Sequence, residues 1–297
     1  MQRIRLELPF APPLEPSNLY GHLAATAVPG VEEWRDGAYR AAVRLAGGPA
    51  IVAVRLPVGS VVPLDLLLTD AADLEDAVAR VRRLLDLDLD PALVGSVLAA
   101  DPALAPLVAD APGRRVPGTL DPTARVLRAV LGQQIATAAA RTITGRLVGA
   151  LGAPIRDPDG GLTALFPPPS AVLADADLAR DVLRMPDSRR RTVLAVAAAI
   201  AEGAVDLAAD PLVVRAALLA LPGVGPWTAD TVRMRALGDA DAFLAGDLGV
   251  VLAARRLGLP DRPGALERRS RAWSPFRAHA VQYLWATGVH PVNSVPA

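Results

Sequence analysis

Strand-like segments are confined to the first quarter of the chain, and this segregation limits the folds that the chain can adopt. Four short runs rich in Val, Leu and Ile, separated by Pro and Gly, predict strands at residues 3–8, 39–46, 49–57 and 61–69. A helix-forming segment, 17–28, lies between the first two runs, and residues 74–87 repeat apolar side chains at helical spacing. The pattern predicts an α+β fold that begins with a small mixed α/β domain containing an antiparallel sheet.

A connector rich in Pro and Gly, at residues 110–122, separates this region from a series of helix-like segments that runs through the rest of the chain. We detect no internal repeat in either part. The sequence therefore predicts an α-helical body after the small domain.

Two absences in the composition limit the chemistry. The 297 residues include no cysteine, which excludes disulfides, thiolate metal sites, iron–sulfur clusters and cysteine nucleophiles. All 31 basic residues are arginine, so no side-chain amine can form a Schiff base with a sugar carbon. The three histidines, His22, His279 and His290, lack the spacing of metal ligands, and we expect no catalytic cofactor.

Hydropathy and charge indicate whether the chain has a membrane segment, a signal peptide or a strongly basic surface. No stretch approaches the roughly 18 uncharged apolar residues that a membrane span needs, and the first residues lack a signal-peptide pattern. We therefore expect a cytoplasmic protein with no membrane segment, and a monomer. The net charge is zero, but residues 101–297 carry 22 Arg against 18 acidic residues. This modest excess permits a local basic surface without requiring one.

The most specific motif is the segment Leu221–Ala229, which reads LPGVGPWTA. A helix is expected to end just before it, two glycines allow a tight hairpin with unusual dihedral angles, and a proline suits the first turn of the next helix. Outward-pointing amides there would bind a DNA phosphate without a basic side chain, since a helix N-terminus is positive. These amides belong to Gly223, Val224 and Gly225. An ordinary turn between two helices is the alternative.

Asp247 lies at the start of a later helix, twenty-two residues beyond Gly225. An aspartate in this position caps the helix. Capping is compatible with catalysis, because the helix dipole and amide hydrogen bonds keep the carboxylate ionised. We therefore interpret Asp247 as a helix cap and as the candidate catalytic carboxylate.

With these motifs the sequence resembles the helix-hairpin-helix DNA glycosylases, and within them the 3-methyladenine DNA glycosylase II family. The resemblance covers nearly the whole chain. Besides LPGVGPWTA and FLAGD, it rests on LYGHLAATAVPGVEEW, LLDLDLDPALV, VLRAVLGQQIATAAARTI, RMPDSRRRTVLAVAAAIAEG and WSPFRAHAVQYLWATG. The likeness is especially close to the glycosylase half of bacterial fusions that join a methyl-accepting regulator to this enzyme. The first residues begin directly in the glycosylase, so we expect no regulator in this chain, and the chain would be either that half alone or a piece of a longer parent chain fused to a regulator.

The resemblance implies three parts: an N-terminal α/β domain (1–95), a helical domain that completes the active-site cleft (96–120 plus 239–297), and a helical domain that carries the hairpin (121–238). It implies a monofunctional enzyme of base excision repair that hydrolyses the N-glycosidic bond of alkylated bases, such as 3-methyladenine and 7-methylguanine, in duplex DNA. Relatives that also cut the strand use a lysine where this chain has Trp227, so we expect no side-chain lyase activity.

By motif match the aromatic walls of the base pocket would be Trp227 and Trp285, which attract a cationic base. Three residues that stand where relatives have aromatic side chains would also line the pocket: His22, Thr231 and Leu248. Gln134 stands where relatives insert an apolar wedge into the stack of DNA bases. The resemblance further implies a structural sodium or potassium ion at the hairpin, held by the main-chain carbonyls of Leu219, Leu221 and Val224.

Arg189 and Arg190 are candidates for contact with the DNA backbone, or for an ordinary solvated helix face. Three alternatives to the main interpretation remain at this stage. The chain would be a non-catalytic helix-hairpin-helix DNA-binding module, a glycosylase for uracil or ethenoadenine, or a small-molecule enzyme. The last lacks support, because the chain has no phosphate-binding loop and no nucleophile motif.

Overall fold

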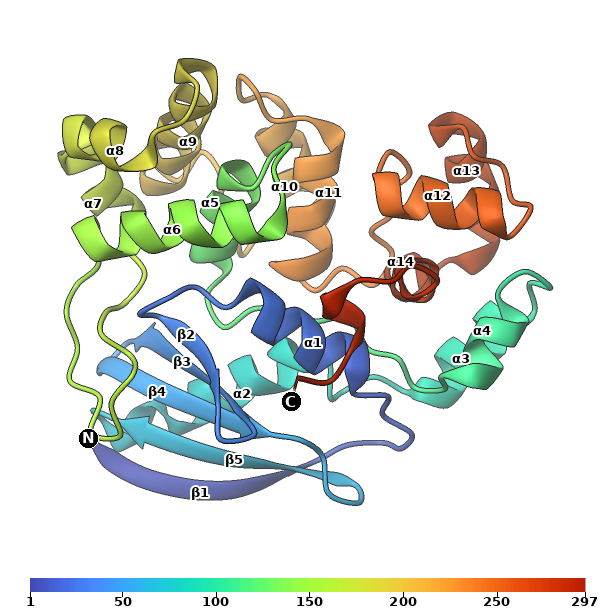
Figure 1. The fold of residues 1–297 in the computed structure, drawn as a ribbon, viewed down its shortest axis with the longest axis horizontal. Helices are drawn as coiled ribbons and strands as arrows, with labels where there is room; N and C mark the ends of the chain where they lie inside the picture. Colours follow the sequence, from blue (N-terminus) through green and yellow to red (C-terminus); the bar gives the residue numbers. More distant parts are fainter. Residues whose placement is uncertain (297) are drawn as a thin grey trace.

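The antiparallel sheet is built from the first 68 residues, as the computed structural model of residues 1–296 shows (Figure 1). Strand β1 (Gln2–Pro9) leads into helix α1 (Ser17–Thr26), after which the chain forms β2 (Glu32–Arg35), β3 (Ala38–Leu45), β4 (Gly48–Arg55) and β5 (Val61–Leu68). The strand order is β1-β5-β4-β3-β2, and every neighbouring pair is antiparallel. The side chains of residues 176 and 178–180 fall outside the described part.

The predicted α+β fold is confirmed, with one strand more than the sequence indicated. The extra strand is β2, a four-residue segment, Glu-Glu-Trp-Arg, at the edge of the sheet that pairs only with β3. Its side chains are all half-buried, so it has no apolar alternation from which a strand could be predicted.

Helices follow the sheet, and several start with an aspartate cap followed by proline. Asp90, Asp121 and Asp210 accept backbone N–H bonds at the starts of three helices, and a proline occupies the next position in each. The helices are α2 (Leu74–Leu84), α3 (Pro91–Ala99), α4 (Ala105–Asp110), α5 (Pro122–Leu131), α6 (Thr137–Leu151), α7 (Pro169–Ala174), α8 (Ala176–Leu183), α9 (Asp187–Ala201), α10 (Pro211–Leu219), α11 (Pro226–Arg235), α12 (Leu248–Arg256), α13 (Pro263–Ser270) and α14 (Arg277–Ala286).

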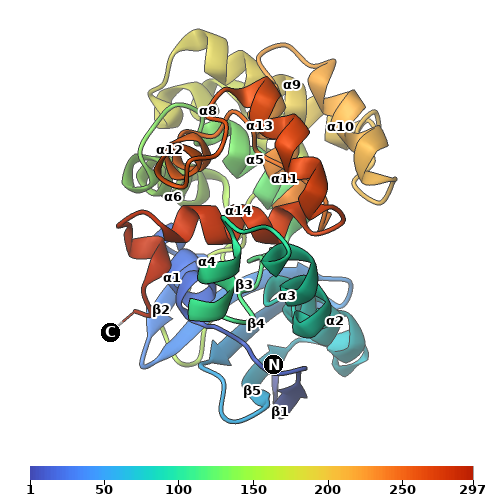
Figure 2. The same cartoon turned by 90° about the vertical axis from the view of Figure 1, so that its right-hand side faces the viewer.

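Three large apolar cores hold the molecule together. One face of the sheet packs on α1 and α2. A second core lies among α5 to α11, and a third joins α3 and α4 to α12, α13 and α14. Figures 1 and 2 place the sheet and α5–α11 at opposite ends, with α1 and α14 between them. Elements from all three cores therefore meet near the middle of the molecule.

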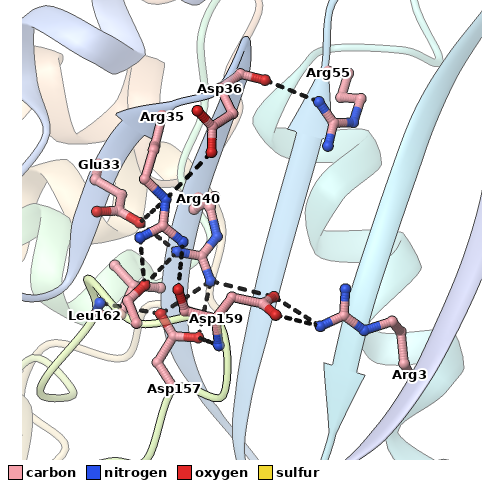
Figure 3. Close-up of polar contacts among 10 residues, drawn as sticks. Arg3, Glu33, Arg35, Asp36, Arg40, Arg55, Asp157, Asp159 and Leu162 are labelled. Atoms are coloured by element: carbon pink, nitrogen blue, oxygen red, sulfur yellow. Dashed lines mark hydrogen bonds and ion pairs between the residues drawn. The ribbon is translucent and has the colours of Figure 1, made fainter.

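The outer face of the sheet is covered by the connection between α6 and α7. Leu162 and Leu165 of this connection pack against the apolar side chains of β3, β4 and β5. Figure 3 shows the polar part of the contact, where Arg40 on β3 reaches Asp157 through two hydrogen bonds of 2.9 Å. Both side chains are buried, at 7% and 1% exposure. Burial disfavours the charged carboxylate, but the bonds from Arg40 and two backbone amides outweigh this and lower the pKa of Asp157.

Among residues 1–296, no helix has both the length and the hydrophobicity that crossing a bilayer requires.

The buried Arg40–Asp157 pair predicts a large stability effect. Asp157→Ala removes one of the two carboxylates bonded to the buried Arg40 guanidinium, together with the acceptor of two backbone amides, and we expect the free energy of unfolding to fall by about 3 kcal/mol. Urea unfolding would measure the change. The control is Arg3→Ala, which removes an ion pair to Asp159 whose side chains are 41% and 40% exposed and which should cost below about 1 kcal/mol. Equal costs for the two substitutions would contradict the prediction.

Candidate active site

A cleft of about 890 Å³ lies where the sheet domain and the two helical cores meet. Its walls come from α1, α5, α6, the α10–α11 hairpin, α12, α14 and the segment after α14. A Cβ at Gly21 would stand 2.4 Å from the carbonyl oxygen of Ser294, so this glycine lets the C-terminal segment lie against α1 beside the cleft. Eight residues predicted from sequence line the same cavity: His22, Gln134, Gly223, Gly225, Trp227, Thr231, Asp247 and Trp285.

Asp247 is held at the cleft by three hydrogen bonds from three different elements. It caps α12, because its Oδ1 accepts the amide N–H of Val250 at 3.0 Å. The indole Nε1 of Trp285 on α14 donates to the same oxygen at 2.7 Å. The indole Nε1 of Trp227 on α11 donates to Oδ2 at 2.8 Å. Each carboxylate oxygen has two lone pairs, so the group can still accept a bond from a water or a ligand.

The two tryptophans therefore present their N–H edges to the carboxylate. Trp227 is 38% exposed at the cleft, and Trp285 is half-buried. The guanidinium carbon of Arg235 lies 5.3 Å from the centroid of the Trp285 ring, so a cation covers one face of this indole. The sequence placed both tryptophans at the site, but their bonds to Asp247 depend on the packing of α11, α12 and α14.

Gly249, which the sequence analysis did not single out, makes room for this arrangement. A Cβ at this position would lie 2.9 Å from Cδ1 of Trp285 and 3.2 Å from both its Nε1 and Oδ1 of Asp247. Any side chain would therefore press on the Trp285–Asp247 bond. The available signal was a glycine in the first turn of a helix, where its high backbone entropy is a disadvantage unless the space is needed.

The hairpin between α10 and α11 has one glycine with a positive φ rather than two. Gly223 has φ +80°, and a Cβ there would lie 2.0 Å from Oγ1 of Thr192 on α9. Gly225 has φ −102°, which other residues adopt, so the expected unusual dihedral angle is wrong at this position. A Cβ at Gly225 would meet nothing within 4 Å. Both glycines line the cleft, whereas Val224 is buried against the core of α5–α11.

The turn between α5 and α6 approaches the hairpin through Gln133. Its Nε2 donates to the carbonyl oxygen of Gly223 at 3.1 Å and to Oγ1 of Thr228 at 2.9 Å. The next residue, Gln134, has φ +56°, a strained conformation for a residue other than glycine. Such strain is often found at functional sites. The bonds of Gln133 fix the turn that carries Gln134 at the mouth of the cleft.

Basic side chains surround His22 on α1. The pKa of His22 lies well below its ordinary value, because burial disfavours the charged form and Arg235, Arg125 and Arg128 repel the proton. His22 is therefore neutral at pH 7. Burial, with repulsion from Arg128, lowers the pKa of Arg125 to about 10, although Glu32 opposes the shift. Arg125 keeps its charge at neutral pH.

The remaining predicted residues divide between the cleft and its surroundings. Thr231 lines the cleft, and its buried Oγ1 has no hydrogen-bond partner among the described residues. Leu248 is 72% exposed and does not line the cleft. Arg189 and Arg190 lie on α9, also outside the lining, where Arg190 pairs with Asp187 at 3.0 Å. Their predicted contacts with DNA stay predictions.

The chain is similar to several known proteins, and their names agree with one another. Residues 5–121 match the AlkA N-terminal domain family. The chain is 48% identical over 295 residues to the probable bifunctional transcriptional activator/DNA repair enzyme AlkA of Mycobacterium tuberculosis. This alignment covers 99% of the chain and 59% of the relative, so the chain spans less than two thirds of that protein's length.

Two further matches extend over nearly the full length of both partners. DNA-3-methyladenine glycosylase 2 of Escherichia coli is 30% identical over 287 residues, covering 94% of this chain and 96% of the relative. The solved structure of the 3-methyladenine DNA-glycosylase from Archaeoglobus fulgidus superposes with a TM-score of 0.81 at 20% identity. It covers 95% of this chain and 97% of the other, which shows that the fold is shared.

The space left by Gly249 predicts the effect of filling it. Gly249→Ala should displace the Trp285 indole, weaken its bond to Asp247 and lower the free energy of unfolding by about 1–2 kcal/mol. Gly264→Ala on α13 is the control, since its Cβ would meet only the tip of Arg268 at 3.9 Å. Urea midpoints and a crystal structure of each variant would measure the effect. An unmoved indole in the Gly249 variant would contradict the assignment.

The lowered pKa of His22 predicts a loss of stability in mild acid. Below about pH 6.5 the unfolded chain takes up a proton that the folded protein excludes, so stability falls as the pH decreases. His22→Gln should remove this contribution, which has a limiting slope of about 1.4 kcal/mol per pH unit. Urea unfolding of both proteins at pH 7 and pH 5 would measure it. Equal losses in the two proteins would show that His22 does not contribute.

Proposed function

This chain belongs to the DNA-3-methyladenine glycosylase 2 family, and from that membership we propose that it removes alkylated bases from duplex DNA by hydrolysing the N-glycosidic bond. The observation that carries the proposal is the carboxylate of Asp247, which faces the cleft and is bonded to two indole N–H groups. The sequence-based expectation of a monomer that acts in the cytoplasm is carried into this proposal.

Asp247 would act on the sugar. When the bond between C1′ and the base nitrogen breaks, its electron pair leaves with the base and positive charge develops on the deoxyribose. A fixed carboxylate stabilises that charge more strongly in the transition state than in the ground state. The cap and the two indole bonds hold Asp247 in place beforehand, and its free lone pairs can orient the water that attacks C1′.

The cleft would receive the flipped base between side chains of several elements. Trp227 and Trp285 offer aromatic surface, and the unpartnered hydroxyl of Thr231 and the neutral ring of His22 offer hydrogen bonds. Leu248, which is exposed beside the cleft, would contact the DNA rather than the base. The volume of about 890 Å³ is large enough for a purine together with its sugar.

Strand cleavage by a side-chain amine is outside the proposal. Trp227 follows the hairpin where lyases of this superfamily carry a lysine, and its indole donates to Asp247. The chain contains no lysine, so water is the proposed nucleophile and an abasic site is the proposed product.

The DNA backbone would bind at the hairpin. Gly223 and Gly225 line the open side of the cleft, where backbone amides at the start of α11 can approach a phosphate. Gln134 would fill the gap left by the flipped base, and Arg189 and Arg190 would add a salt-dependent contribution.

A sodium or potassium ion is part of the same proposal. The carbonyl of Leu219 belongs to the last residue of α10 and that of Leu221 lies just beyond it, where the helix dipole favours a cation, although the oxygen of Leu221 also accepts the amide of Val224 at 3.2 Å. With the carbonyl of Val224 they would hold the ion, which would supply positive charge next to a phosphate.

The proposal predicts that Asp247→Asn abolishes base release while DNA binding persists. The amide can still cap α12, but it cannot stabilise positive charge on the sugar, so the rate should fall by about 10²-fold or more. Duplex DNA treated with a methylating agent is the substrate, and freed bases are resolved by mass. Strands should break only after added alkali.

Asp90→Asn is the matched control, because Asp90 caps α3 outside the cleft lining and should leave the rate unchanged. A wild-type protein that binds DNA but frees no base would reduce the chain to a DNA-binding module. Strand breaks without alkali would instead overturn the monofunctional assignment.

A further inference from the structure

The charge of the cleft is unbalanced toward positive. Among the described residues that line it, Asp247 is the single carboxylate. Five arginines line the same cavity: Arg125, Arg128, Arg141, Arg235 and Arg256. A pocket that takes up a base carrying a positive charge would be expected to present the opposite balance, because like charges repel strongly where water is displaced.

Most of these arginines are engaged by the protein. Arg128 pairs with Glu32 at 2.7 Å, Arg141 donates to the carbonyl oxygen of Ala27 at 2.8 Å, and Arg256 donates to Thr287 at 3.1 and 3.2 Å. These contacts explain why the three arginine side chains lie where they do. The charge of Arg128 is in addition compensated by a carboxylate.

Arg125, on α5, is the exception. Its buried Nε has no acceptor among the described residues, and it forms no ion pair with a described carboxylate. It lies close enough to His22 and Arg235 to repel a proton from both. With a pKa of about 10 it stays protonated at neutral pH. Glu32 attracts this charge but is paired with Arg128, so the charge of Arg125 is offset only in part and acts on whatever occupies the cleft.

Arg235 adds to this effect from behind the aromatic wall. Its guanidinium covers one face of the Trp285 ring at 5.3 Å and is tied by a 2.8 Å bond to the carbonyl oxygen of Pro117. An aromatic ring attracts a cation through its electron-rich face. A cation already placed on one face repels a second one that approaches the other face, so Trp285 attracts a cationic base less strongly than a free indole would.

We propose that Arg125 is a specificity-determining residue of this cleft, which shifts its preference from cationic bases toward uncharged bases that present a carbonyl oxygen or ring nitrogen to the guanidinium. This inference rests on the proposed glycosylase function and specifies the substrate class of the same site. It adds a charge criterion to the shape and stacking that Trp227 and Trp285 supply.

The charge of Arg125 should have opposite effects on the excision of a cationic base and of an uncharged base. A cationic base, such as 7-methylguanine, enters with one positive charge and leaves neutral, so Arg125 opposes its entry. An uncharged base, such as hypoxanthine, enters neutral and leaves as an anion when the electron pair of the C1′–N bond moves onto it. Arg125 stabilises that developing negative charge. Both bases are purines with an oxygen at C6. Because 7-methylguanine also has an N7 methyl and a 2-amino group, each variant is compared with wild type on the same base, which leaves the Arg125 charge as the difference measured.

The test compares wild type with Arg125→Gln on duplexes containing a single 7-methylguanine or a single hypoxanthine. The substitution should raise kcat/KM for 7-methylguanine and lower it for hypoxanthine, on the order of tenfold in each direction. Arg125→Lys keeps the charge and should retain the wild-type ratio of the two rates. Arg189→Gln on α9, outside the cleft lining, is the control for a general effect on DNA binding, and should change both rates by the same factor.

A binding measurement makes the result independent of catalysis. Duplexes carrying the same two bases on 2′-fluoro sugars resist hydrolysis, because fluorine disfavours positive charge on the sugar. Arg125→Gln should bind the 7-methylguanine duplex more tightly relative to the hypoxanthine duplex than wild type does. Equal changes for both bases, in rates and in affinities, would reduce Arg125 to a structural residue and overturn the proposal. If wild type frees neither base, the proposed function fails, and the affinity ratio still decides the role of Arg125.

Discussion

The carboxylate of Asp247 joins the parts of the structure that form the cleft. It receives a backbone amide from α12, one indole N–H from α11 and another from α14. Helix α11 belongs to the core of α5–α11, whereas α12 and α14 belong to the third core. Hydrogen bonds to a charged acceptor are strong, and three from separate elements fix its position more tightly than a cap alone. The geometry of the cleft depends on this one group.

Two glycines permit the close approach that this geometry requires. Gly249 lets Trp285 reach Asp247, and Gly223 lets the hairpin lie against Thr192 on α9. At both positions a methyl group would displace a side chain of the site or of the helix that supports it. The hairpin is also bonded to Gln133, so the strained turn at Gln134 is tied to the hairpin. The site is thus held by contacts between segments that are far apart in the sequence.

The electrostatics of the cleft have two components with opposite consequences. Asp247 and the aromatic rings favour positive charge, as a glycosidic transition state requires on the sugar. Arg125 and Arg235 disfavour it on the side proposed for the base, and the same positive surroundings keep His22 neutral. Arg235 interacts with both components, since it covers one face of Trp285 and is also attracted by the charge of Asp247. The same cavity can therefore distinguish charge on the sugar from charge on the base.

The sequence by itself determined that a sheet comes before the helices along the chain, and it determined the α10–α11 hairpin, the cap at Asp247 and the absence of any lysine. These features depend on residues close together in the chain, such as Gly223 before Pro226, or on composition alone. Tertiary structure decided the rest. The edge strand β2 forms because β3 offers it a partner, and its own residues have no strand pattern. The indole bonds to Asp247, the space at Gly249 and the unpaired charge of Arg125 arise from long-range packing, which no local pattern encodes.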